Sequence, residues 1–155
     1  MKPLAAQQAC PCGRLAGPGG STMALAPGAK PGPAGKPLTY GNCCGRWLEL
    51  APRTAQVPDA ESLMRSRYSA FVLERAAYLL TSWAASHRPE TIEFESGVKW
   101  LGLDVRAHRV TGDNTAEVEF VARQKPAKGP AVRLHERSRF VREAGGWLYV
   151  DGDAL

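Results

Sequence analysis

Four cysteines in two close pairs constrain this chain more than any other feature of its sequence. Cys10 and Cys12 flank a proline, and Cys43 and Cys44 follow after an interval of thirty residues. Zinc needs four deprotonated ligands in a tetrahedron, and a chain supplies them most readily as two close pairs. Closing a longer loop costs only about 0.6 kcal/mol per doubling of its length, so the interval does not prevent a shared site. The sequence therefore predicts that Cys10, Cys12, Cys43 and Cys44 bind one structural Zn²⁺ ion.

Other states of the four thiols stay open at this point. They could be reduced and unliganded, whereas a redox or iron–sulfur role is less favoured because no C-x-x-C spacing is present. The first thirteen residues contain one lysine and no apolar run of signal-peptide length. We therefore expect a cytoplasmic protein, in a compartment where disulfides are rare. No window approaches the roughly 18 apolar residues of a spanning helix, so we expect no contact with a membrane.

Charge and composition divide the chain near residue 57. Residues 1–57 hold six of the 20 Lys and Arg residues and one of the 15 acidic residues, so the net charge of +5 lies there. Residues 13–41 are rich in Gly, Pro and Ala, and such a composition buries too little apolar surface to offset the entropy of ordering. We expect a zinc-binding segment, 1–57, interrupted by a mobile insertion, 13–41, and a globular domain, 58–155, that folds without the cysteines.

The domain 58–155 has helical patterns first and strand patterns afterwards. Asp59 is a suitable N-cap for a helix, and a second short helix is expected over about 76–83. From Trp100 onward the apolar residues recur with a period of two, with turn residues at 112–114 and 145–146. This order predicts an α+β fold in which helices pack on a curved, cone-like antiparallel sheet.

Two sets of motifs resemble known families. Cys10-Pro11-Cys12-Gly13, followed by Cys43-Cys44-Gly45, resembles the SEC-C zinc motif at the C-terminus of the SecA translocation ATPase. The segments ESLMRSRYSAF (61–71), LHERSRFVRE (134–143) and GWLYVDG (146–152) resemble the bacterial YchJ family, in which this motif precedes a nuclear transport factor two-like (NTF2-like) domain. The resemblance covers residues 1–13 and 41–155, and the insertion between them departs from the family pattern. It implies a zinc head and a cone-shaped domain, and the relationship to SecA implies docking of the head on a chaperone or ribosomal surface.

One predicted strand carries alternating polar residues that suggest a pocket. His135, Arg137 and Arg139 point to one face, and Glu136, Ser138 and Phe140 point to the other. We predict that the basic set lines the concave face, where it would bind an anion or an acidic peptide. The first helix would add three further candidates, Arg65, Arg67 and Tyr68. Two alternatives stay open: the large ring of Phe140 favours the opposite orientation, and the arginines could form a wall of ion pairs with Glu117, Glu119 and Glu136.

These observations favour a zinc-binding adaptor whose head docks on a protein or peptide partner. Nucleic acid is a less favoured partner, because four thiolates with one Zn²⁺ lower the positive charge of the head by two. The alternative is a small-ligand-binding protein or enzyme that uses a cone pocket around His135 and Arg139. The sequence contains no set of nucleophile, base and acid that would identify a catalytic residue, and it does not indicate the oligomeric state.

Overall fold

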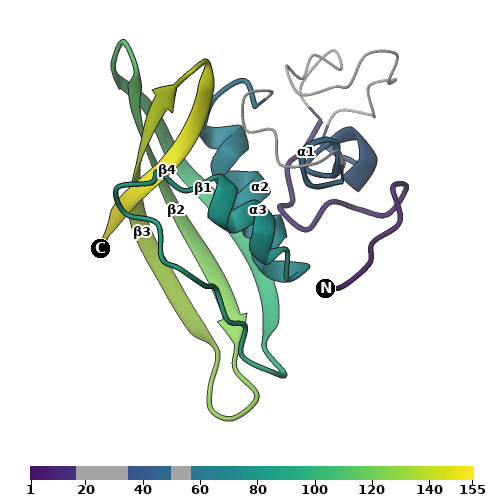
Figure 1. The fold of residues 1–155 in the computed structure, drawn as a ribbon. Coiled ribbons are helices and arrows are strands. Elements are labelled where there is room, and N and C mark those ends of the chain that lie inside the picture. Colours follow the sequence, from purple (N-terminus) through teal and green to yellow (C-terminus); the bar gives the residue numbers. More distant parts are fainter. Residues whose placement is uncertain (17–34, 50–56) are drawn as a thin grey trace.

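The protein forms three layers, which are seen in the computed structural model of Figure 1. The structure describes residues 1–16, 35–49 and 57–155. A four-stranded sheet makes the first layer, and helices α2 (Ala60–Val72) and α3 (Ala76–Thr81) cover one of its faces. The N-terminal segment, with a 3₁₀ turn η2 (Tyr40–Asn42) and helix α1 (Gly45–Leu48), packs on the far side of α2. Most of the predicted insertion, residues 17–34, lies outside the described residues.

The sheet is an antiparallel meander with the strand order β1-β2-β3-β4. Its strands are β1 (Lys99–Gly112), β2 (Thr115–Lys125), β3 (Val132–Glu143) and β4 (Gly146–Ala154). Three shifts of register between β1 and β2 bend the edge of the sheet, since each β-bulge kinks its strand. The predicted α+β class, with helices on a curved antiparallel sheet, is confirmed.

A further β-bulge in β4 decides which side chains of that strand face the helices. Arg139 pairs with Asp151, whereas its neighbour Phe140 pairs with Tyr149, so Val150 is an extra residue in β4. Beyond the bulge the strand continues to Ala154.

Helix α2 begins as the sequence predicts. The Asp59 side chain accepts a hydrogen bond from the backbone N–H of Ser62 at 2.7 Å, which caps the first turn. The helix is buried around most of its circumference, because the sheet lies on one side and the N-terminal segment on the other. Small polar residues are therefore buried along the helix. Buried hydroxyls need a hydrogen-bond partner, and Ser66 Oγ donates to the carbonyl oxygen of Leu63 at 2.7 Å.

A single hydrophobic cluster connects the cysteines with the sheet. It includes Cys12 and Cys44 from the N-terminal segment, Leu63 from α2, and Val118 and Phe140 from the sheet. The division at residue 57 stays a prediction, but this shared core argues against independent folding of residues 58–155. Within the described parts of the chain, no helix is both long and apolar enough to cross a membrane.

Candidate metal centre and cone cavity

The four cysteine side chains meet at one buried point beside α2. Their Sγ atoms all lie within 4.8 Å of one another. The Sγ atoms of Cys12 and Cys43 are 3.6 Å apart, and those of Cys43 and Cys44 are 3.9 Å apart. Sulfurs bound at ~2.3 Å to a central Zn²⁺ ion would lie about 3.8 Å apart along each edge of a tetrahedron. Two of the six sulfur separations match that edge and all are within 4.8 Å, so the four sulfurs can surround one metal ion. The thiols are free rather than paired in disulfides.

A short backbone ladder brings the two cysteine pairs together. The N–H of Cys10 donates to the carbonyl of Leu38 at 2.9 Å, and the N–H of Leu38 donates to the carbonyl of Arg14 at 2.9 Å. The ladder reaches as far as Ala16 and Gly35, where the N–H of Gly35 donates to the carbonyl of Ala16 at 3.1 Å. The described ends of the predicted insertion are thus hydrogen-bonded to each other, which holds the site together in spite of the long interval.

Two arginines bind the backbone of the cysteine loops. Arg46 Nε donates to the carbonyl of Cys43 at 3.0 Å, and Arg65 Nη1 donates to the carbonyl of Cys12 at 3.2 Å. Four thiolates around a divalent cation carry a formal charge of −2, which these guanidinium groups would offset. Residues that orient metal ligands in this way support the affinity of a site.

A serine of α2 touches the cluster directly. Ser69 Oγ lies 3.6 Å from Cys10 Sγ, and both atoms are buried. Hydrogen bonds from the thiols of Cys12, Cys43 and Cys44 lower the pKa of Cys10, whereas burial raises the pKa of Cys44. A metal ion binds all four sulfurs only when each thiol has lost its proton, and burial of Cys44 opposes that loss.

A cavity of about 590 Å³ lies between α2, the sheet and the segment 82–98 that connects α3 with β1. Arg67 and Tyr68 line it, as the sequence predicts for a pocket in the cone. Arg65 does not, because it lies two residues from Arg67 along the helix, which is a rotation of about 200°. This rotation places Arg65 on the head side of α2, where its Nε donates to Glu61 at 2.9 Å. The first helix therefore contributes two of its three candidates to the cavity.

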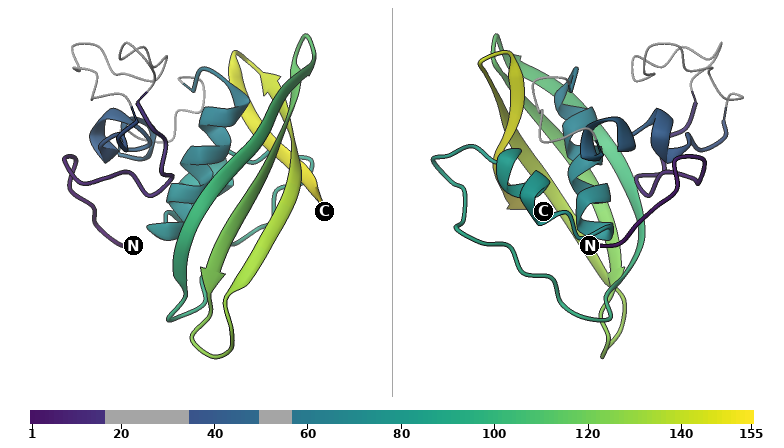
Figure 2. Two further views of the ribbon diagram at one scale, coloured as in Figure 1. Left: turned by 180° about the vertical axis from the view of Figure 1, so that it is seen from behind. Right: turned by 45° about the vertical axis from the view of Figure 1, so that its right-hand side comes forward.

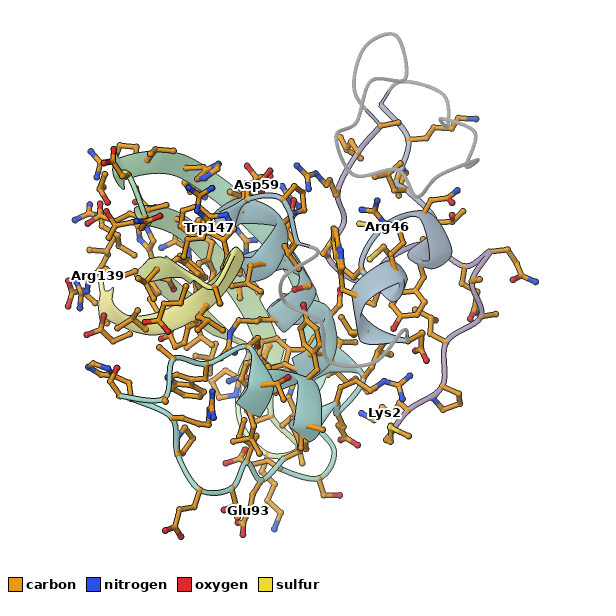
Figure 3. The ribbon with its side chains drawn as sticks, turned by 45° about the horizontal axis from the view of Figure 1, so that its top comes forward. Lys2, Arg46, Asp59, Glu93, Arg139 and Trp147 are labelled. Atoms are coloured by element: carbon orange, nitrogen blue, oxygen red, sulfur yellow. The ribbon has the colours of Figure 1, made fainter. Side chains whose placement is uncertain are left out.

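The predicted basic set of β3 directs its polar groups away from the helices, which corrects its predicted placement in the pocket. Arg139 Nε donates to Asp151 Oδ1 at 2.6 Å on the outer face of the sheet, and Figure 3 shows Arg139 pointing away from the domain. His135 borders the cavity, but its Nε2 lies 2.7 Å from Glu119 Oε1, on the outer face. Arg137 does not line the cavity either. The outer face is thus a wall of polar pairs, as one of the alternatives expected. Glu119 is one of the expected partners, whereas Asp151 is a partner that the sequence did not suggest.

The opposite set of β3 faces the cavity, and Glu136 is its charged member. Glu136 Oε1 accepts hydrogen bonds from Ser138 Oγ at 2.7 Å and from the Tyr149 hydroxyl at 3.2 Å. Burial, together with the charge of Glu136, raises the pKa of Tyr149, so its hydroxyl stays a donor at neutral pH. A Cβ atom at Gly152 would overlap the Glu136 side chain. Glycine in β4 therefore makes room for this carboxylate, and two hydroxyls fix its direction.

Arg67 has a structural role at the same end of the cavity, beside Tyr149. Its Nη1 donates to the carbonyl of Leu79 at 2.8 Å and to Ser82 Oγ at 2.6 Å, which anchors the end of α3. The guanidinium lies 5.0 Å from the ring centroid of Trp83 and 4.5 Å from that of Tyr149. Burial lowers the pKa of Arg67 to about 10, so the side chain stays charged at neutral pH.

The chain is similar to known proteins over most of its length. Residues 59–152 match the family model described as YchJ, middle NTF2-like domain. The chain belongs to the YchJ family. Its relatives include a UPF0225 protein of Polaromonas sp. (strain JS666), 60% identical over 93% of this chain and 91% of the relative. Another UPF0225 protein, from Methylibium petroleiphilum, is 59% identical over 79% of this chain and 88% of the relative.

A solved structure is similar to this YchJ-family chain over most of its length. It is the solution structure of a SEC-C motif containing protein from Rhodopseudomonas palustris, with a TM-score of 0.64 and 30% identity. The similarity covers 78% of this chain and 95% of the solved one. The family and fold implied by the sequence motifs are therefore confirmed.

The sequence prediction preferred the basic set of β3 for the cavity of this YchJ-family domain, whereas Glu136, from the alternative orientation, faces it. The signal was present in the same strand, because Phe140 shares a face with Glu136 and a large aromatic ring favours burial. The neighbouring strand gives the same answer, since Phe120 pairs with Glu136 and Ala122 with Leu134 across β2 and β3. An apolar set on β2 and Phe140 on β3 together identify the inner face.

Proposed function

We propose that this protein is a zinc-binding adaptor whose N-terminal head docks on a protein partner. The observation that carries the proposal is the buried set of four sulfurs within 4.8 Å of one another. Zinc is the metal that best suits four thiolates in a tetrahedron, and such a site leaves no open position for a substrate or water. A closed site of this kind stabilises a surface instead of catalysing a reaction.

The position of the head supports a docking role. It lies on the side of α2 that faces away from the sheet, as both views of Figure 2 show. Leu15 is 53% exposed there and offers a protein partner an apolar contact point. The relative from Rhodopseudomonas palustris, a SEC-C motif containing protein, supports a common use of this head.

Site-specific photo-crosslinking tests the proposal. A photoreactive residue at Leu15 would report partners of the head, and one at Val110, near the end of β1, would serve as the matched control. Both positions are exposed and apolar, at 53% and 73% of full exposure, and they lie on different parts of the molecule. We expect a crosslinked protein from Leu15 only, and we expect it to be lost in a Cys43→Ser background. Restoring zinc to chelated wild-type protein should restore the crosslink.

Two results would count against the adaptor. Crosslinks that form equally from Val110 would place the partner elsewhere, and crosslinks from Leu15 that survive both chelation and Cys43→Ser would separate docking from the metal.

A further inference from the structure

The cavity of the cone has two aromatic walls. On one side, the ring centroids of Tyr68 and Trp100 lie 5.4 Å apart, and those of Phe71 and Phe94 lie 6.3 Å apart, each pair edge to face. A second aromatic group, of Trp83, Phe140 and Tyr149, lies at the end that holds Glu136, with centroid distances of 5.1 and 5.8 Å. A volume of about 590 Å³ falls within the range of small-molecule sites. The walls suit a flat apolar body, since aromatic faces stack on rings and attract cations.

The carboxylate of Glu136 is the polar group best placed to recognise a ligand. Within the described structure, the hydrogen bonds that it accepts from Ser138 and Tyr149 both fall on Oε1. Its second oxygen is therefore available to a donor, and the two hydroxyls hold the carboxylate in one orientation. A carboxylate at neutral pH accepts hydrogen bonds only, so the matching ligand group is an N–H or an ammonium.

The charges around the cavity disfavour an anionic ligand. Four carboxylates line it, of Glu74, Glu93, Glu95 and Glu136, against three cations. One of these cations, Lys2, lies 3.4 Å from Glu74, and Arg67 already donates Nη1 to two protein acceptors. The third, Arg133, is exposed to solvent at the edge of the cavity. Glu93 and Glu95 are exposed on the segment 82–98, where they make the approach to the cavity acidic.

We propose that this cavity binds a small organic amine with a flat apolar body, whose ammonium or N–H group donates to Glu136. The site is separate from the cysteine cluster, and the inference does not depend on the adaptor proposal. It also moves the small-ligand hypothesis away from His135 and Arg139, which point to the outer face.

A series of three indoles tests this assignment on the full-length protein. Tryptamine carries an ammonium, indole carries no charge and indole-3-acetate carries a carboxylate, while the ring stays the same. Binding is followed through the indole N–H signals of the protein in two-dimensional NMR. Trp83 and Trp100 line the cavity, whereas Trp47 and Trp147 do not, so the protein contains its own control signals.

We expect tryptamine to shift the signals of Trp83 and Trp100 and to leave that of Trp47 in place. Its dissociation constant should be about tenfold lower than that of indole, because a charge-assisted hydrogen bond is added, and indole-3-acetate should bind most weakly. The substitution Glu136→Gln keeps the side-chain shape and should bring tryptamine and indole to within about twofold of each other. Glu143→Gln, on an exposed residue of the same strand, is the matched control and should change nothing.

A second variant keeps the test decisive if Glu136→Gln fails to fold. Phe94→Ala removes part of the aromatic wall from the connecting segment and should weaken all three indoles alike. The proposal is overturned if none of the indoles shifts Trp83 or Trp100, or if indole-3-acetate binds as tightly as tryptamine. It is also overturned if a folded Glu136→Gln protein keeps the preference for tryptamine, or if Phe94→Ala weakens none of the three.

Discussion

Adding one methyl group at Gly152 should destabilise the protein through Glu136 alone. Gly152 does not adopt the left-handed backbone conformation that only glycine accepts readily, so alanine meets no backbone strain there. The new Cβ would instead overlap the Glu136 side chain, which must then move into the cavity. This movement breaks the hydrogen bonds from Ser138 and Tyr149.

The magnitude follows from those two bonds. A hydrogen bond to a charged group contributes about 1.5–3 kcal/mol, but the displaced carboxylate can reach water through the open cavity and recover part of this. We therefore expect Gly152→Ala to lower the free energy of unfolding by about 2 kcal/mol. For a chain of this size such a change lowers the melting temperature by about 4–8 °C.

A double-mutant cycle measures the coupling directly. In a Glu136→Ala background the alanine at 152 has nothing to displace, and its cost should vanish or become a gain of up to ~1 kcal/mol from the reduced entropy of the unfolded chain. Gly145→Ala is the control, because Gly145 has a φ of +80° with open space around it. It should cost about 1 kcal/mol in either background, since its penalty comes from the backbone. Chemical denaturation of the four proteins of the cycle and of the two controls supplies the values.

If Gly152→Ala costs as much without the Glu136 side chain as with it, the reasoning fails. Such a result would mean that the strand, and not the carboxylate, requires glycine at this position.

Four further predictions concern the metal site and the outer face. Purified protein should contain about one zinc per chain by elemental analysis, and a chelator should lower the melting temperature of the main transition, because the cysteines belong to the shared core; an unchanged melt would show that the domain is independent. Metal affinity should fall as the pH falls, because protons compete for the thiols, and burial raises the pKa of Cys44; competition with a chromogenic chelator across pH measures this trend. Ser69→Ala should weaken zinc binding about 10-fold to 100-fold in the same assay, through loss of the hydroxyl beside Cys10, and equal affinities would refute that role. Arg139→Gln should leave the indole titrations unchanged, because Arg139 binds Asp151 on the outer face; altered affinities would return it to the pocket.

The elements of the fold were predictable because each has a strong local signal. Asp59 caps α2 as its position before an apolar helical pattern indicates, and the turn at 113–114 separates β1 from β2 as predicted. The clustering of the cysteines was predictable as well, since the two close pairs suit one tetrahedral ion. The backbone ladder that brings the two cysteine pairs together has no comparable signal in the sequence. Its hydrogen bonds join main-chain groups, which every residue type supplies.

The orientation of β3 could not be taken from its own alternation, since a period of two defines two faces without saying which one is inside. The answer depends on partners distant in sequence. The bulge at Val150 turns Asp151 outward, toward Arg139, and places Gly152 inward, where it leaves room for Glu136. The burial of Arg67 could not be predicted for the same reason. It depends on hydrogen-bond acceptors at the end of α3, and the residues next to Arg67 in the sequence do not indicate them.

The backbone ladder that ends at Ala16 and Gly35 makes the position between these two residues a suitable insertion site for protein engineering. The backbone atoms at the two ends are hydrogen-bonded at 3.1 Å. The positions of the cysteines therefore do not depend on the length of the segment that connects these ends. A segment twice as long would add only about 0.6 kcal/mol of closure entropy. An epitope or a small fluorescent domain whose own termini lie close together could therefore replace residues 17–34 while the four sulfurs keep their spacing.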